Sequence, residues 1–532
     1  MIQHYKRILL CLLIMSAGLN LQAQYTVSPS AVKLYSALSA IKNLYVDDVQ
    51  DNMLVDEAIK AMIAKLDPHS AYMTPEEMKE MNEPLQGGFD GIGISFNMLN
   101  DTLFVVEVIS GGPSEKVGLL PGDRIMTVDG ENIAGVKISN KEVMKRLKGP
   151  KGTLVVLQVK RRSSKEWLSF RIVRDKIPIY SLDASFMIDD NTGYIRLNRF
   201  GATTADEFRQ AFDDLKRQGM EDIVLDLQSN GGGLMNAAVE LADEFLSDGK
   251  CIVYTEGIHS PRMQSDAHSK GVFEKGKLVI LIDEYSASAS EIVAGAIQDW
   301  DRGIIIGRRS FGKGLVQRPV PLPDGSSLKL TVSRYYTPSG RFIQKPYEDI
   351  ESYDMDLIDR YNRGEMIHAD STHFPDSLKT TTLIRKRTIY GGGGIMPDIF
   401  VPYDTSRYTT LHKRLSASGV LNRFSLHYVD THRKELSYAY ASSDTFIEQF
   451  SVSDSLLQEL LRFAEDEKVQ VTDAEKMSDM TLLKKQLKAY MARDLYKSAE
   501  YYRVMWTDNE SLLKALEMLN DKKKYADLLE RE

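Results

Sequence analysis

The stretch "SASASEIVAGAIQD", residues 286–299, places three serines on alternate positions just before an apolar pattern with helical spacing. One of these serines could be a nucleophile, since a serine hydroxyl beside a suitable base can attack a carbonyl carbon. A structural interpretation also fits, because Ser288 and Glu291 stand three residues apart and match a capping box. Helix caps are far commoner than catalytic serines, so this motif alone favours a helix start.

A base for such a nucleophile is suggested by a second motif, "SFGKGLVQ", residues 310–317. None of the nine histidines lies between Lys277 and Gln317, but Lys313 stands between two glycines with apolar neighbours. Ser-Lys pairs are a known variant of the nucleophile-base arrangement. Lowering the pKa of a lysine from about 10.4 to near 7 costs roughly 4 to 5 kcal/mol, which burial can supply. If the stretch is helical or tightly turned, the Gln317 amide can hold the lysine nitrogen towards the serine.

Strands that alternate with amphipathic helices position these motifs. The runs "DIVLDLQ", "KLVILID" and "GIIIGR" each precede or follow a helical pattern, and "PDIFVPYD" near residue 400 predicts a returning strand. Such alternation predicts a parallel sheet covered on both faces, with functional sites at the carboxyl ends of its strands. The glycine loop "SNGGG" and the serine loop both follow strands, so we expect them to face each other. This α/β domain spans 177–404, with a polar insertion at 348–386.

The preceding region, 86–176, changes to a period of two. Its motifs "GIGI", "GGPSEKVGLLPGD" and "LKGPKGT" occur in the order that resembles a PDZ domain, which implies an inserted β-barrel. In that resemblance the peptide-binding turn consists of Gly91, Ile92, Gly93 and Ile94. Their N–H groups would hold the terminal carboxylate of a peptide, and a strand edge would pair with its main chain. A short glycine motif by itself indicates only a tight turn.

The two ends of the chain have different patterns. Residues 1–23 combine Lys6, Arg7 and a short apolar run, which is typical of a secretory signal peptide. We therefore expect an exported chain, periplasmic or secreted, that has no transmembrane segment after cleavage. Helical spacing predicts a helical segment over 25–85 and a charged helical region over 405–532.

Composition excludes several classes of function. The 532 residues are 43% hydrophobic with a net charge of -8, which is ordinary for a globular protein and argues against nucleic-acid binding. Once the signal is removed, Cys251 is the remaining cysteine, so we expect it to be buried and inert, with no internal disulfide. The chain lacks metal-ligand spacing and a phosphate-binding loop, which implies neither a metal nor another cofactor.

Taken together, the motifs resemble the C-terminal processing peptidases, or tail-specific proteases, of family S41. The resemblance covers roughly 54–404 and also includes "LDPHSAY", "TPSGRFIQ" and "GIMPD". It implies a crotonase/Clp-protease-like core in which Ser288 is the nucleophile, Lys313 the base and Gln317 the residue that orients the lysine. His69 in "LDPHS" is interpreted as structural.

The same resemblance implies an oxyanion hole formed by the N–H groups of Gly232 and Ala289. Here the sequence departs from the family pattern D-L-R-x-N-P-G-G, because Gln228 and Gly231 replace the usual arginine and proline. The glycine makes the loop more flexible, so its preorganisation is the least secure part of the site.

The sequence thus predicts a serine endopeptidase that binds the free C-termini of protein and peptide substrates through its PDZ domain. The alternative is a peptide-binding protein of the same fold that is catalytically silent. The presence of Ser288, Lys313 and Gln317 argues against that alternative. The sequence leaves open whether the chain forms a homo-oligomer, and it does not identify the substrate.

Overall fold

The computed structural model describes residues 28–99, 101–162, 164–268, 270–371, 374–404, 406–476 and 480–530. The signal peptide that the sequence predicts at 1–23 lies outside the described residues. The chain divides into two compact units, 1–66 and 67–532.

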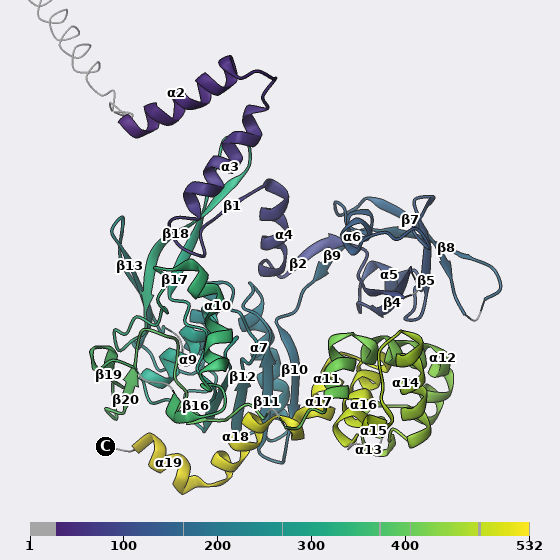
Figure 1. The fold of residues 1–532 in the computed structure, drawn as a ribbon. Helices are drawn as coiled ribbons and strands as arrows, with labels where there is room; N and C mark the ends of the chain where they lie inside the picture. The colour runs from purple at the N-terminus through teal and green to yellow at the C-terminus, as the bar shows by residue number, and fades with distance from the viewer. Residues whose placement is uncertain are drawn as a thin grey trace, which may run out of the picture. The chain divides into compact units, whose positions relative to one another are not determined.

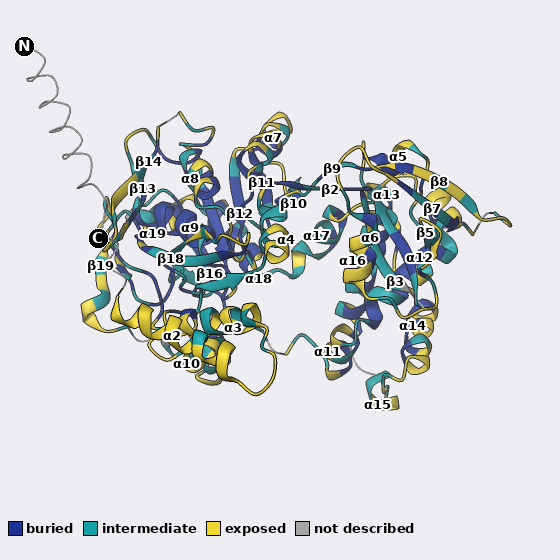
Figure 2. Ribbon diagram, turned by 90° about the horizontal axis from the view of Figure 1, so that it is seen from above, coloured by how far each residue is buried: buried dark blue, intermediate teal, exposed yellow. Residues whose placement is uncertain are grey.

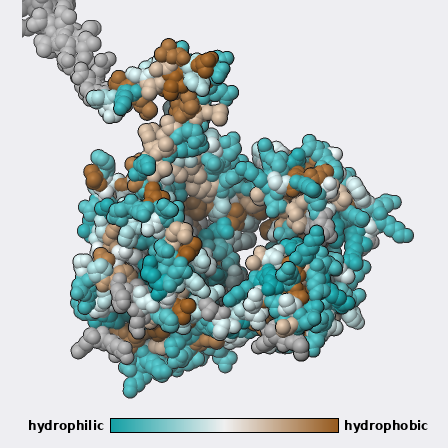
Figure 3. Space-filling view, viewed as in Figure 1, coloured by the Kyte–Doolittle hydropathy of each residue, from teal (hydrophilic) through white to brown (hydrophobic). Residues whose placement is uncertain are grey.

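The described part of the first unit consists of two helices, α2 (Pro29–Leu44) and α3 (Asp51–Ile63). The Ser28 hydroxyl caps α2 by accepting from the Ala31 N–H at 3.2 Å. Every residue of α2 is at least partly exposed. Brown, apolar surface therefore gathers over these helices in Figure 3. Its large exposed side chains include Val32, Leu34, Tyr35, Ile41, Leu44, Tyr45, Met53 and Met62.

The second unit opens with a short strand and a helix, followed by the PDZ domain. The first two elements are β1 (Ala71–Met73) and α4 (Pro75–Leu85). The strands β2 (Gly88–Gly91) and β9 (Asp175–Pro178) pair antiparallel where the chain enters and leaves the domain. Between them lie β3 (Ile94–Leu99), β4 (Thr102–Val108), α5 (Pro113–Lys116), β5 (Arg124–Val128), β6 (Glu131–Asn132), α6 (Asn140–Leu147), β7 (Leu154–Lys160) and β8 (Leu168–Val173). The sheet order is β3-β4-β5-β7-β8, so β3 forms one edge.

A six-stranded sheet forms the centre of the α/β domain, in the order β10-β11-β12-β15-β16-β21 (Figure 1). Its strands are β10 (Leu182–Met187), β11 (Thr192–Leu197), β12 (Asp222–Asp226), β15 (Leu278–Ile282), β16 (Ile304–Gly307) and β21 (Ile399–Phe400). All neighbours are parallel except β10 and β11. The predicted fold class is confirmed, and the sequence did not indicate the antiparallel edge strand.

Both faces of this sheet are covered, but from different parts of the chain. One face packs against α7 (Thr204–Arg217), α8 (Met235–Asp243) and α9 (Ala289–Asp299), and every residue of α9 is buried (Figure 2). The other face packs against α18 (Glu510–Asn520) and α19 (Lys522–Glu530). The Tyr525 hydroxyl donates to Leu278 O at 3.0 Å and accepts from Leu278 N at 2.9 Å. The last helices of the chain are therefore part of the α/β domain.

The α/β domain also contains a second sheet, in the order β1-β18-β13-β14 with β17 paired to β18. It contains β13 (Cys251–Gly257), β14 (Ser260–Asp266), β17 (Leu315–Pro321) and β18 (Ser327–Tyr336). The polar stretch interpreted as an insertion, 348–386, forms α10 (Ile350–Asn362), two 3-10 helices, η1 (Ala369–Ser371) and η2 (Asp376–Leu378), and the strand β19 (Lys379–Thr381). The strand β20 (Thr388–Tyr390), just beyond this stretch, pairs with β19 in a hairpin. On α10, the buried Arg360 donates to Arg309 O and Ser310 O. This helix therefore packs against the loop that precedes Lys313.

The region after residue 405 is helical, as predicted, and contains a core of its own. That core is formed by α11 (Thr410–Ala417), α12 (Val420–Ala439), α13 (Ser443–Gln449), α14 (Asp454–Asp466) and α16 (Thr481–Leu495), with the short α15 (Asp473–Lys476) beside them. The chain then continues through α17 (Ala499–Met505) and η3 (Trp506–Asp508) to α18. Among the helices in the described ranges, none has the length and apolarity needed to cross a bilayer.

Candidate active site

The three serines of the "SASAS" loop have different environments, and this difference separates their roles. Ser286 and Ser290 are fully buried, and their hydroxyls donate at 2.8 Å to Leu227 O and Asn230 O. Ser288 is partly exposed, with φ 55° and ψ −112° at the start of α9. Such a backbone conformation costs about 1 to 3 kcal/mol for a non-glycine residue, and it occurs mostly at functional sites. Of the three serines, Ser288 is therefore the one that a substrate can reach.

Glu291 connects the serine loop to the lysine loop. Its buried carboxylate accepts four hydrogen bonds, from Ser288 N (2.7 Å), Lys313 N (2.9 Å), Gly312 N (2.7 Å) and Ser310 Oγ (2.5 Å). Burial raises the pKa of this carboxyl, and these donors oppose the rise. The sequence indicated only a capping residue that reaches back to Ser288. A charged residue next to the apolar run of α9 was the sequence signal of a further role.

Lys313 lies between β16 and β17, half-buried, in the environment that a neutral base requires. Burial, together with the positive charge of Lys329, lowers the pKa of its ammonium group to about 8. The Tyr335 hydroxyl donates to Lys313 O at 2.6 Å and lies 3.2 Å from Ser288 O. The backbones of Ser288 and Lys313 are thus linked twice, through the Glu291 carboxylate and through the Tyr335 hydroxyl.

Gln317 lies on β17, so the stretch after Lys313 is a strand and not the helix or tight turn that the orienting role presupposed. Its amide donates to the Thr331 hydroxyl at 3.3 Å, and that hydroxyl donates to Asp67 at 3.1 Å. The side chain therefore belongs to a polar chain beside the lysine loop. Its role in orienting Lys313 stays a prediction.

The two predicted oxyanion donors lie beside Ser288 but differ in their present hydrogen bonding. Gly232 has φ +98°, and a Cβ there would fall 2.8 Å from Ser288 Cβ, so glycine is required. Its N–H donates to Asn230 Oδ1 at 2.9 Å. The Ala289 N–H, at the first turn of α9, has no acceptor within the part of the chain that the structure describes. If the two N–H groups form the predicted oxyanion hole, that of Ala289 is free to donate, whereas that of Gly232 would have to give up its hydrogen bond to Asn230.

Asp283, at the end of β15, holds the glycine loop against the serine loop. Its carboxylate accepts from Ser229 N (2.9 Å), Ser229 Oγ (3.1 Å), Tyr285 N (3.0 Å) and Ser286 N (3.1 Å). Burial raises its pKa, and the backbone donors oppose the rise. As expected, the two loops face each other at the carboxyl ends of neighbouring strands.

His69 lies closer to this site than a purely structural interpretation implied. Burial and the nearby charge of Lys313 lower the pKa of its imidazole to about 4, so the ring is neutral at pH 7. Its Nε2 lies 2.8 Å from the Tyr353 hydroxyl. Because the ring is neutral, it places no second positive charge next to Lys313. Sequence spacing could not reveal this, because β1 carries the "LDPHS" motif to β18.

The remaining predicted residues lie elsewhere in the second unit. Gly91 ends β2 and Gly93 has φ +77°, so the turn before the edge strand β3 has the conformation that glycine permits. The carbonyl of Ile92 accepts from Ser114 N at 3.0 Å, so the turn is anchored to α5. Cys251 is half-buried at the start of β13, and burial raises the pKa of its thiol to about 11, which leaves it protonated near neutral pH.

Comparisons with family models agree with this architecture. Family models match peptidase family S41 at residues 191–352, a PDZ domain at 91–172, an activating protease CtpB N-terminal domain at 16–77 and a family of unknown function at 411–497. A carboxy-terminal-processing protease of Bartonella bacilliformis is 36% identical over 62% of this chain and 78% of its own length. The carboxy-terminal processing protease CtpA of Bacillus subtilis is 32% identical over 78% of this chain and 88% of its own length. A solved photosystem II D1 C-terminal processing protease aligns at 30% identity, covering 59% of this chain and 90% of that protein, with a TM-score of 0.33.

The chain belongs to the carboxy-terminal processing proteases of peptidase family S41, a family of serine proteases. It carries a PDZ domain, as the sequence motifs predicted.

Proposed function

We propose that this protein is an exported endopeptidase that cleaves near the C-terminal tails of its substrates with Ser288 as nucleophile and Lys313 as base. The observation that carries the proposal is the buried Glu291 carboxylate, which receives hydrogen bonds from Ser288 N and Lys313 N at once. A carboxylate that joins these two loops fixes the nucleophile and the base relative to each other. A protein that only bound peptides would have no need of such a link.

The proposed reaction uses neutral Lys313 as its base. The Ser288 hydroxyl attacks the scissile carbonyl and gives its proton to the lysine nitrogen, while the Ala289 N–H donates to the oxyanion that forms. Lys313 then protonates the leaving amine, which leaves an acyl group on Ser288. Water attacks this ester after passing a proton to the lysine, and the carboxylic acid leaves as the serine recovers its proton. With a pKa of about 8, roughly a tenth of the lysine is neutral at pH 7.

The PDZ domain supplies the selection of chain ends in this proposal. The turn of Gly91 to Ile94 precedes β3, an edge strand that can pair with an extended peptide. Suitable substrates are proteins with loose, apolar C-terminal tails and a free carboxylate. Capture of the tail by this turn would raise the local concentration of the substrate at Ser288.

Export is proposed from the sequence of residues 1–23, and it places the mature protein in the periplasm or outside the cell. N-terminal sequencing of the protein recovered from a periplasmic fraction is expected to begin near Gln24. A chain that retains Met1 and fractionates with the cytoplasm would contradict export.

The decisive experiment incubates wild type and Ser288→Ala with a folded protein that carries an apolar C-terminal tail, and identifies the fragments by mass spectrometry. Wild type is expected to produce internal cleavage products, whereas Ser288→Ala binds the tail and produces none. Ser290→Ala is the control, because it loses a structural hydroxyl from the same loop and is expected to keep measurable activity. A wild-type protein that binds the tail without cleaving it would support the silent peptide-binding alternative.

A further inference from the structure

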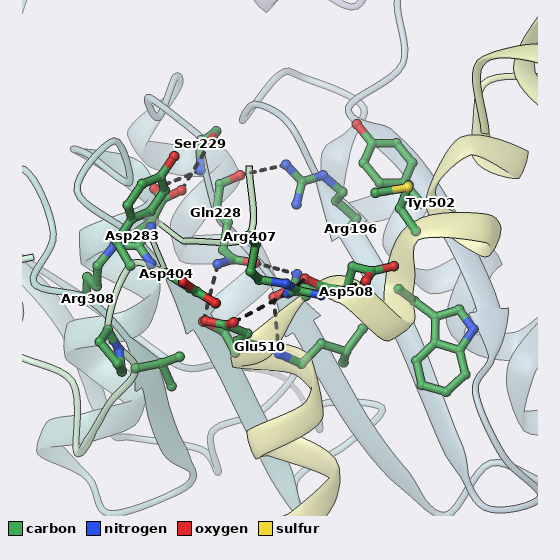
Figure 4. A pocket seen from close by; sticks show the side chains of 18 of the residues that line it. Arg196, Gln228, Ser229, Asp283, Arg308, Asp404, Arg407, Tyr502, Asp508 and Glu510 are labelled. Carbon is green, nitrogen blue, oxygen red and sulfur yellow. Dashed lines mark hydrogen bonds and ion pairs between the residues drawn. The ribbon is translucent and has the colours of Figure 1, made fainter. Parts of the chain in front are cut away.

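The C-terminal segment contacts Gln228, the residue just before the glycine loop, through an amide pair that lines the pocket drawn in Figure 4. Asn509 Nδ2 donates to Gln228 Oε1 at 2.7 Å. The same asparagine caps α18, because its Oδ1 accepts from Leu512 N at 3.2 Å. Gln228 Nε2 also lies 3.5 Å from the Ser511 hydroxyl. The side chain of Gln228 is therefore hydrogen-bonded to residues at the start of α18.

The backbone of Gln228 is fixed as firmly as its side chain. Its N–H donates to Asp226 Oδ1 at 2.8 Å, and its carbonyl accepts from Arg196 Nη2 at 2.9 Å. Arg196 in turn pairs with Asp226 at 2.5 Å and lies over the Tyr502 ring, with its guanidinium carbon 4.9 Å from the ring centroid. Tyr502 belongs to α17, so a second contact links the C-terminal segment to the end of β12.

The arginines of this pocket are already paired with carboxylates, and one of the pairs reaches the C-terminal segment. The pocket encloses about 310 Å³ between the loops of the sheet and the C-terminal helices. Three arginines line it, and each is paired with a carboxylate: Arg196 with Asp226, Arg308 with Glu284, and Arg407 with Asp508. The positive charge of each arginine is thus balanced by a carboxylate of the protein itself.

A short path leads from Gln228 to the nucleophile. The next residue, Ser229, has φ 60° and is bound by Asp283. Asn230 follows, and its carbonyl accepts from Ala287 N at 3.0 Å and from Ser290 Oγ at 2.8 Å. Gly232 then lies against Ser288. A displacement at Gln228 would therefore be transmitted over four residues to a predicted oxyanion donor.

We propose that Gln228 and Asn509 are positioning residues, through which the C-terminal segment holds the glycine loop in register with Ser288. The inference rests on the proposed function, because it assumes that an oxyanion forms beside this loop. It gives a physical role to Gln228, which stands where the family pattern has arginine.

The test uses two variants that preserve the surrounding structure. Gln228→Met keeps the length of the side chain and loses the amide, and Asn509→Ser keeps a helix cap and loses the donor to Gln228. Thr409→Ser, an exchange of one cap for another at α11, is the matched control. We expect kcat to fall about tenfold in each variant with KM within about twofold, which is less than the 10²- to 10³-fold loss from removing an oxyanion donor outright. The double variant should be no slower than either single variant.

A second measurement does not depend on activity. Amide hydrogen exchange of residues 229–232 is expected to accelerate in Gln228→Met and in Asn509→Ser, and to match wild type in Thr409→Ser. Unchanged exchange in both variants, or additive losses of kcat, would overturn the proposal. If wild type itself cleaves no substrate, the proposed peptidase function fails, and the exchange data still decide whether the amide pair holds the loop.

Discussion

At the scale of single residues, the proposed mechanism depends on a lysine that can lose its proton near neutral pH. Burial and Lys329 both lower the pKa of Lys313, to about 8, while Glu291 and Asp67 raise it. A substitution of Lys329 should therefore change the pKa of the proposed base and leave Lys313 itself intact. Its own pKa is lowered by burial, so it too lies in a poorly solvated position.

The pH dependence of kcat/KM follows from this environment. Because the base must be neutral, activity is expected to rise with pH through about 8 and to level off above it. Lys329→Met removes a positive charge, so the pKa of Lys313 should increase and the rise should move to higher pH. At pH 7 the rate should fall about twofold to fivefold. The control is Lys275→Met, at the opposite end of β15.

The same profile distinguishes a base from a fixed cation. Lys313→Arg keeps the positive charge but cannot be neutral at any accessible pH, because the arginine pKa exceeds about 12. We expect it to be as inactive as Lys313→Ala while still folded by circular dichroism. A folded Lys313→Arg within about tenfold of wild type would remove lysine from the role of base.

At the scale of elements, Glu291 caps the start of α9 and also links the loop of Ser288 to the loop of Lys313 through hydrogen bonds. Glu291→Gln leaves two of the four N–H and O–H donors facing an amide nitrogen that cannot accept from them. Each buried unsatisfied donor costs about 1 to 3 kcal/mol, so we expect a loss of roughly 2 kcal/mol or more in the free energy of unfolding. The kcat should fall at least tenfold, since the nucleophile and base loops separate.

A matched control for this prediction occurs in α4. Thr74 and Glu77 form a capping box with the same spacing, in which Glu77 Oε2 accepts from Thr74 N at 2.8 Å. Glu77→Gln should cost less than about 1 kcal/mol, because glutamine also completes such a box. Urea unfolding of both variants provides the comparison. Equal costs at the two positions would mean that Glu291 acts only as a cap.

The sequence predicted the elements that are local and missed those that depend on distant pairing. The apolar runs that became β12, β15 and β16 and the helical spacing of α9 have clear local periods. The strand β18 does not, since it is defined by antiparallel partners as distant as β1 and β13. Gln317 was misplaced for this reason, because a few residues after "GKG" do not reveal pairing with β18. The roles of Asp283 and Tyr335 likewise required the loops to be folded together.

At the scale of the whole molecule, the proposed function assigns the selection of chain ends to the PDZ domain. A free carboxylate held by the N–H groups of the turn at Gly91 to Ile94 forms charge-assisted hydrogen bonds, each of about 1.5 to 3 kcal/mol. Amidation of a peptide's C-terminus should therefore weaken its binding to Ser288→Ala at least tenfold, as measured by calorimetry. Equal affinity for amidated and free peptides would rule out recognition of the carboxylate.

The packing of α18 and α19 on the central sheet has a practical consequence for anyone who produces this protein in shortened form. A chain that stops at Asp404, where sequence motifs place the domain boundary, would leave one face of the sheet open to water. That face contains Val224, Val279, Leu281, Ile304 and Ile306, all buried in the full chain. Such an apolar surface favours aggregation. We expect the truncated chain to accumulate in inclusion bodies and the full chain to stay in the supernatant, so the minimal catalytic unit of this enzyme is discontinuous in sequence.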